Sequence, residues 1–170
     1  MRKILLVIDM QTDFVDGALG SAEAVSIIPS VLREIGKYDK SDIIATRDTH
    51  PENYMNTREG RYLPVPHCIK DTEGWQIVPE LDALRKTEAI DKRTFGSREL
   101  IALLAEKQGI ESITLCGLCT DICVISNALL IKAYYPEIPL SVVANACAGV
   151  TPESHQNALN AMKMCQVEIV

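Results

Sequence analysis

The stretch "SITLCGLCTDICV" (112–124) runs from a short apolar segment directly into the start of a predicted helix. The segment 112–117 is short and apolar enough for a buried strand. From about Thr120 to Tyr134 the sequence is predicted to be helical. A strand that passes into a helix in this way is the repeating unit of a parallel sheet. The stretch therefore indicates an α/β fold.

The same alternation of apolar runs and amphipathic helical stretches extends along the chain. Further strands are predicted at 4–8, 41–46, 88–91 and 140–146, with a last one inside 165–170. The helices between them have predicted N-caps at Ser26, Ser97 and Thr151. Parallel strands joined by right-handed crossovers form a three-layer α/β/α sandwich. We expect one such domain over residues 1–170, with a six-stranded parallel sheet.

The amino-acid composition argues against several classes of function. The 170 residues carry a formal net charge of −6, which argues against a broad contact with nucleic acid or an anionic membrane. No apolar run approaches the ~18 residues of a membrane span, and Asp9 ends the apolar start too early for a signal peptide. The six cysteines lie mostly in apolar, regular segments, unlike a disulfide framework. We therefore predict a cytoplasmic protein.

Polar residues follow four of the predicted strands at the point where each ends. They are Asp9, Asp48, the pair 91–92 and the run 119–121. In open parallel sheets, ligands bind beyond the carboxyl ends of the strands. The topology therefore predicts a shared site at that edge.

Cys123 is a candidate nucleophile because it falls in the first turn of the predicted helix, where the dipole and unpaired amides favour a thiolate. Asp9 could take the thiol proton, and Lys92 could hold Asp9 charged and oriented. The alternative is that Cys123 is a core residue and the other two form an ordinary ion pair, since free cysteine is often buried.

Cys116 and Cys119 form a C-x-x-C pair, which raises the alternative of a thioredoxin-like redox protein. Such a pair belongs at the exposed start of a helix, whereas Cys116 lies within a predicted strand and would point away from the rim. We therefore disfavour a redox pair, and a three-cysteine zinc cluster still more.

Candidate metal ligands come from residues 49–80 and their border, where four prolines interrupt any periodicity. Asp48 and His50 lie two residues apart, and His67 follows; one carboxylate and two imidazoles suit zinc, iron or manganese. The alternative is that these are solvated loop residues or helix caps. His155 is expected to be exposed on the polar face of a late helix.

Five stretches together resemble the isochorismatase-like cysteine hydrolase superfamily, and within it most of all the metal-containing nicotinamidases. They occur in the family's order: "VIDMQTDF" (7–14), "ATRDTHPENY" (45–54), "LPVPHC" (63–68), "DKRTFGS" (91–97) and "LCGLCTDICV" (115–124). Single motifs of this kind are weak, but five in order are specific. The resemblance implies the strand order 3-2-1-4-5-6.

The resemblance also implies catalytic roles. Asp9, Lys92 and Cys123 would form a triad with Cys123 as the nucleophile. The family's non-proline cis peptide would join Leu118 to Cys119, and the backbone amides of Cys119 and Cys123 would form the oxyanion hole.

Pocket and metal positions follow by the same resemblance. Phe14, Phe95 and Leu63 match the substrate pocket, although Pro64 stands where the family often has a tryptophan and Trp75 lies elsewhere. The implied ligands of one divalent ion, zinc before iron or manganese, are Asp48, His50, His67 and Glu59. Glu59 would replace a histidine that this chain lacks.

The resemblance implies hydrolysis of a small carboxamide through a thioester, with nicotinamide, nicotinate and NAD salvage as the leading hypothesis. The partner would be this small amide, with no nucleic acid or membrane, and we expect a homo-oligomer. Alternatives are a superfamily hydrolase of ureido, carbamoyl or biuret-type amides, which often lacks the metal, an isochorismatase proper, and the C-x-x-C redox protein.

Overall fold

Six parallel strands form one sheet in the order β3-β2-β1-β4-β5-β6, which confirms the predicted order. The computed structural model describes residues 1–81, 84 and 89–170. The strands are β1 (Arg2–Ile8), β2 (Ile43–Asp48), β3 (Ile90–Lys92), β4 (Ile110–Leu118), β5 (Leu140–Ala148) and β6 (Glu168–Ile169). The strand predicted at 88–91 begins on Glu88, which lies outside the described residues.

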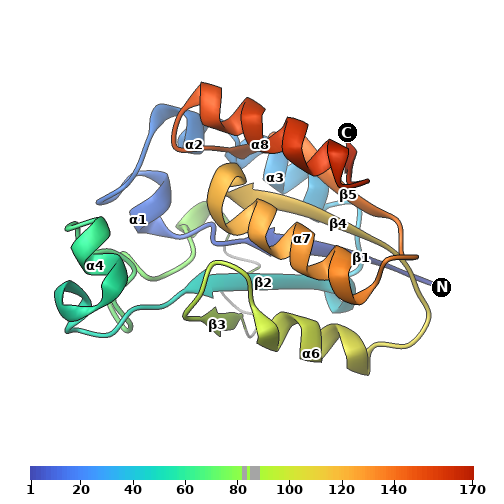
Figure 1. Cartoon of the computed structure of the whole chain (residues 1–170), viewed down its shortest axis with the longest axis horizontal. Helices are drawn as coiled ribbons and strands as arrows, with labels where there is room; N and C mark the ends of the chain where they lie inside the picture. The colour runs from blue at the N-terminus through green and yellow to red at the C-terminus, as the bar shows by residue number, and fades with distance from the viewer. Residues whose placement is uncertain (82–83, 85–88) are drawn as a thin grey trace.

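Helices cover both faces of this sheet and complete the predicted three-layer sandwich (Figure 1). The α-helices are α1 (Thr12–Val15), α2 (Ala22–Ser26), α3 (Ile28–Ile35), α4 (Arg58–Tyr62), α6 (Arg98–Glu106), α7 (Ile125–Tyr134) and α8 (Pro152–Met164). Helix α3 packs on β1 and β5 from one face, while α6, α7 and α8 lie side by side on the other. Among the described residues, no helix has the length and apolarity needed to cross a membrane.

Burial on both faces explains the composition of the central strand. The five residues Ile4–Ile8 are all apolar and at most 1% exposed. A strand covered by helices on both sides has no solvent-facing positions, so it shows a continuous apolar run instead of alternation. The core therefore lies on either side of β1 and its neighbour β4.

One predicted helix start is wrong. Ser26 ends α2 instead of capping α3, and Ser21 caps α2 by accepting a hydrogen bond from the amide of Ala24. The helical stretch is divided near Ile27 because Pro29 has no amide hydrogen to donate back to the preceding turn. The caps at Ser97 and Thr151 are confirmed, since each side chain accepts a hydrogen bond from an amide three residues on.

The segment 49–80 is more ordered than the absence of periodicity suggested. It contains α4 and the 3₁₀ turns η2 (Tyr54–Asn56) and η3 (Pro79–Leu81). The helix predicted from Thr120 begins as a π-helical turn, η4 (Thr120–Val124), before α7. In Figure 1 the strands point toward α1 and α4, so these irregular segments lie at the carboxyl edge of the sheet.

Candidate active site

Three side chains predicted to meet at the carboxyl edge do so. Asp9 directly follows β1 in a left-handed conformation, φ +47°, and its side chain is fully buried. Its Oδ2 lies 2.6 Å from Nζ of Lys92, at the end of β3, while its Oδ1 accepts a hydrogen bond of 2.6 Å from the hydroxyl of Thr46. Lys92 Nζ also lies 3.3 Å from Sγ of Cys123, on the turn η4. The sheet therefore brings together residues far apart in sequence.

The protonation of these groups is governed by burial. Burial raises the pKa of Asp9 more than the charge of Lys92 lowers it. Burial alone would lower the pKa of Lys92, but the charges of Asp9, Cys123 and Asp48 raise it, so the amine stays charged. The pair thus couples an ammonium to a carboxylate with more than usual affinity for a proton.

The pKa of Cys123 is raised well above its ordinary value, first by burial and then by the Asp9 charge, with a hydrogen bond to Asp9 contributing. Burial therefore opposes the stabilisation of a thiolate that is expected at the helix start. Cys123 is only 4% exposed, and a buried group beside a carboxylate keeps its proton. A base must take that proton before the sulfur can attack.

Gln11 has a role that the sequence analysis missed. Its side-chain amide donates to the carbonyl oxygens of Asp48 and Trp75, at 2.8 and 2.9 Å, and its oxygen accepts from the amide of Asp48 at 2.7 Å. Gln11 therefore holds the end of β2 where the metal candidates begin. Its only sequence signal was its place two residues after Asp9.

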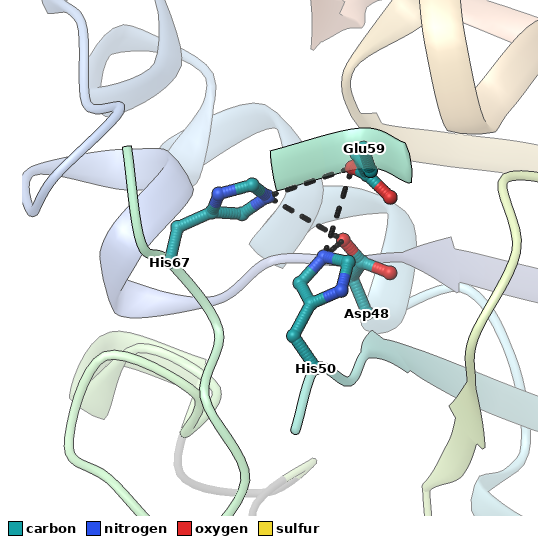
Figure 2. A group of neighbouring side chains, drawn as sticks. All are labelled: Asp48, His50, Glu59 and His67. Atoms are coloured by element: carbon teal, nitrogen blue, oxygen red, sulfur yellow. Dashed lines mark hydrogen bonds and ion pairs between the residues drawn. The ribbon is translucent and has the colours of Figure 1, made fainter. Parts of the chain in front are cut away.

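The four candidate metal ligands converge, as Figure 2 shows. Their ligand atoms all lie within 4.8 Å of one another. Oδ2 of Asp48 lies 2.9 Å from Nε2 of His50 and 3.8 Å from Nε2 of His67. Oε1 of Glu59 lies 3.7 and 3.9 Å from the same two nitrogens.

These separations fit one metal ion. Donor atoms about 2.0–2.1 Å from a tetrahedral zinc ion lie roughly 3.4 Å from one another, close to the spacing found. Nδ1 of His67 donates to the carbonyl oxygen of Val65, which leaves Nε2 free to bind a metal. Burial raises the pKa of Asp48, but hydrogen bonding from His50 and the charge of Lys92 outweigh it, so this carboxylate is ionised. Two carboxylates and two imidazoles form a donor set suited to a divalent cation.

One cavity of about 450 Å³ joins the two groups. Cys123 lines it together with Asp48, Glu59 and His67. The three predicted pocket residues, Phe14, Leu63 and Phe95, also line it, whereas Trp75 packs under the guanidinium of Arg47 instead. A small molecule in this cavity would contact both the thiol and the metal ligands.

The predicted cis peptide bond joins Leu118 to Cys119, and Cys119 lines the cavity as Cys123 does. The C-x-x-C alternative finds no support in this geometry. Cys116 is fully buried in β4, and burial raises its pKa well above the usual value and that of Cys119 to about 12. Thiol exchange needs an accessible thiolate, which neither residue offers.

His155 is half-buried, contrary to the expectation of an exposed side chain. Its Nδ1 lies 2.7 Å from the hydroxyl oxygen of Thr120 on the turn η4. The helical pattern of α8 could not reveal this contact, because Thr120 belongs to a different element.

Comparisons with known proteins agree with this fold. Residues 3–170 match the family model of the isochorismatase domain. The nicotinamidase of Schizosaccharomyces pombe is 24% identical, over 98% of this chain and 91% of that protein. The pyrazinamidase of Pyrococcus horikoshii, solved in complex with zinc, is 33% identical with a TM-score of 0.81, covering 100% of this chain and 99% of that one. The pyrazinamidase/nicotinamidase of Streptococcus mutans is 32% identical with a TM-score of 0.84, and 99% of each chain is covered.

The doubly wound sheet with its site at the carboxyl edge defines an α/β enzyme fold. The chain belongs to the isochorismatase family, as its five motifs predicted.

Proposed function

We propose that this protein hydrolyses nicotinamide to nicotinate and ammonia through a thioester on Cys123. The observation that carries the proposal is the cavity that Cys123 shares with Asp48, Glu59 and His67, three members of the candidate metal cluster. The coarser assignment, an isochorismatase-family hydrolase of amide bonds, is supported by the family match and by relatives named nicotinamidase or pyrazinamidase.

Asp9 is the proposed general base. Its raised pKa makes it a better proton acceptor than an ordinary carboxylate, and its charge is one of the causes that raise the pKa of the thiol whose proton must leave. As Asp9 takes this proton, the sulfur attacks the amide carbon of the substrate. Lys92, 2.6 Å from Asp9, holds the carboxylate in place and balances the negative charge that moves between oxygen and sulfur.

The amide oxygen becomes negatively charged in the tetrahedral intermediate. The backbone amides of Cys119 and Cys123 are the proposed donors to it, a contribution of about 3 kcal/mol for one donor. When the intermediate collapses, the C–N bond breaks and Asp9 returns its proton to the departing ammonia. Asp9 then takes a proton from water as the water attacks the thioester; the C–S bond breaks to release the acid, and Asp9 returns the proton to the sulfur.

Asp48, His50, Glu59 and His67 would hold one divalent ion, for which we propose zinc. When bound, this ion supplies a Lewis-acid site for the pyridine nitrogen of the substrate. The side chains of Phe14, Leu63 and Phe95 would enclose the ring, so that its carboxamide faces Cys123. The protein's part is thus to orient a flat aromatic amide between two fixed groups.

The remaining expectations belong to the same proposal. The small amide would be the partner of the protein, and neither nucleic acid nor a membrane would be bound. We propose a homo-oligomer that acts in NAD salvage in the cytoplasm.

The test is ammonia release from nicotinamide by purified, zinc-replete protein. Wild type and Cys165→Ser, which changes an exposed cysteine, should turn over equally, whereas Cys123→Ser should be inactive. Absence of turnover in wild type would reject nicotinamide as substrate. Turnover of a carbamoyl or ureido amide instead would favour the other branch of the superfamily, and protein purified without metal would support that result.

A further inference from the structure

A hydrogen bond connects helix α8 to the turn that carries the proposed nucleophile. Nδ1 of His155 lies 2.7 Å from Oγ1 of Thr120. Thr120 is fully buried at the first position of η4, directly after Cys119 and three residues before Cys123. Burial lowers the pKa of His155, so its imidazole is neutral near pH 7 and able to accept the threonine hydroxyl.

A second contact joins the same two elements. The carboxylate of Asp121 accepts a hydrogen bond from the amide of Val150, just before α8, at 3.1 Å. Gly149 lies so close to His155 that a Cβ on it would be 2.8 Å from the backbone nitrogen of His155. Gly149 and Val150 also line the cavity that contains the nucleophile. The beginning of α8 therefore supports the cavity wall formed by η4.

Backbone hydrogen bonds connect the two ends of the turn η4. The carbonyl oxygen of Cys119 accepts hydrogen bonds from the amides of Ile122 and Val124, both at 3.1 Å. A rotation at Thr120 would therefore be passed to both ends of the turn. Those ends carry the two amides proposed for the oxyanion hole and the sulfur of Cys123.

We propose that His155 is a positioning residue: through Thr120 it sets the orientation of the turn 120–124 and hence of the Cys119 and Cys123 amides. The kinetic consequence rests on the proposed function, whereas the orientation of the turn can be measured without turnover. Misplacing catalytic groups by about 1 Å costs on the order of 100-fold in rate.

The experiment uses two pairs of variants. Thr120→Val and His155→Phe remove the hydrogen bond with little change of size, while Thr120→Ser retains the hydroxyl and His155→Asn retains an acceptor at the position of Nδ1. Gln156→Ala, the next residue on α8, is the control, because its side chain donates to Asn160 on the same helix. All are compared for kcat and KM on nicotinamide, zinc content and the free energy of unfolding.

We expect Thr120→Val and His155→Phe to lower kcat by about 10- to 100-fold, with KM and zinc content unchanged. Thr120→Ser, His155→Asn and the control should stay near wild type. The double variant Thr120→Val/His155→Phe should be no slower than the slower single variant, because both remove one interaction. Unchanged kcat in both disrupting variants, or an equal loss in Thr120→Ser, would overturn the proposal. If Thr120→Val does not fold, the comparison of the two variants at His155 tests the proposal.

Amide hydrogen exchange separates this proposal from the proposed function. Faster exchange confined to 119–124 in the disrupting variants, with unfolding free energy unchanged, supports the positioning role even if wild type hydrolyses no amide. In that case the proposed function fails alone. Unchanged exchange in this turn rejects the positioning role whatever the activity.

Discussion

The candidate site has two sides that are built differently. On one side, Asp9 and Lys92 lie at the ends of strands and are fully buried, with Cys123 beside them on η4. On the other side, the metal candidates begin at the end of β2 and continue into the segment 49–80, where the side chain of Glu59 is 29% exposed. The hydrogen-bond ladder of the sheet holds the first group, and a loop with short helices holds the second.

This difference separates the chemistry from the placement of substrate. In the triad, the ammonium of Lys92 balances the negative charge of Asp9. The same ammonium also lies 3.6 Å from Oδ1 of Asp48. The metal candidates place two carboxylates within a few ångströms, and a cation relieves their repulsion. We therefore expect changes in the triad to stop the reaction with metal still bound, and changes in the loop to act through metal or substrate affinity.

The largest effect is expected for Asp9→Asn. The amide cannot take the thiol proton, so kcat should fall about 1,000-fold or more, while zinc content stays at one per chain. Ammonia release and metal analysis on the same sample measure both. A variant that retained a tenth of the activity would remove Asp9 from proton transfer, and one that lost its zinc would show that the two sides are not separable.

Lys92→Met should reduce stability as well as activity. Removing one member of a buried ion pair costs about 3 kcal/mol or more, because the buried charge of Asp9 is left without an opposite charge. Urea denaturation measures the loss, and Lys163→Met, which changes an exposed lysine, should cost almost nothing.

The loss in Lys92→Met should depend on pH. In the folded protein the pKa of Asp9 is raised above the unfolded value of 3.8, and without Lys92 it would rise further. A raised carboxyl pKa means that the folded state binds the proton more tightly than the unfolded state does. The loss of unfolding free energy in Lys92→Met is therefore small near pH 4, and it grows as the pH rises through the pKa of Asp9 in the folded state. A loss of equal size at about pH 5 and pH 8 would contradict this explanation.

Glu59→Gln should have a smaller and reversible effect. A neutral amide is a poorer ligand than a carboxylate, so zinc affinity should fall at least about tenfold, and added zinc should restore kcat. Glu52→Gln, on the same segment but outside the ligand cluster, is the matched control. Equal zinc affinity of the two variants would exclude Glu59 as a ligand.

The smallest effect is expected for Phe95→Ala. This side chain lines the cavity but is 46% exposed, so it loses only part of its contact area with the substrate. KM for nicotinamide should rise by roughly three- to tenfold with little change in kcat. A fall in kcat with KM unchanged would instead assign Phe95 to the reacting geometry.

Much of the site could be predicted because parallel strands end at one edge. Once the strand order is known, Asp9, Asp48 and Lys92 must lie together, and Asp48 pairs with Lys92 in the ladder of β2 and β3. The neighbouring Asp91 shows the same rule in reverse, since it alternates to the other face and pairs with Arg47.

Other features could not be predicted because they depend on contacts between elements. Gln11 bonds to the backbone of Asp48, and His155 to Thr120, across 37 and 35 positions of the chain. The break between α2 and α3 was missed because Ser26 has the residue type of a cap but not its extended conformation. The raised pKa of the Cys123 thiol could not be predicted because burial is a property of the whole fold.

By itself, the sequence determined the fold class, the strand order through its motifs, and the residue types gathered at the sheet edge. Periodicity and strand ends are local properties, so they can be recognised in the amino-acid sequence. Only the tertiary structure decided that the Lys92 ammonium lies within hydrogen-bonding distance of both the Asp9 carboxylate and the Cys123 sulfur, that four ligands surround one point, and that α8 supports η4. These depend on burial and on distances of a few ångströms between remote segments, which no local pattern contains.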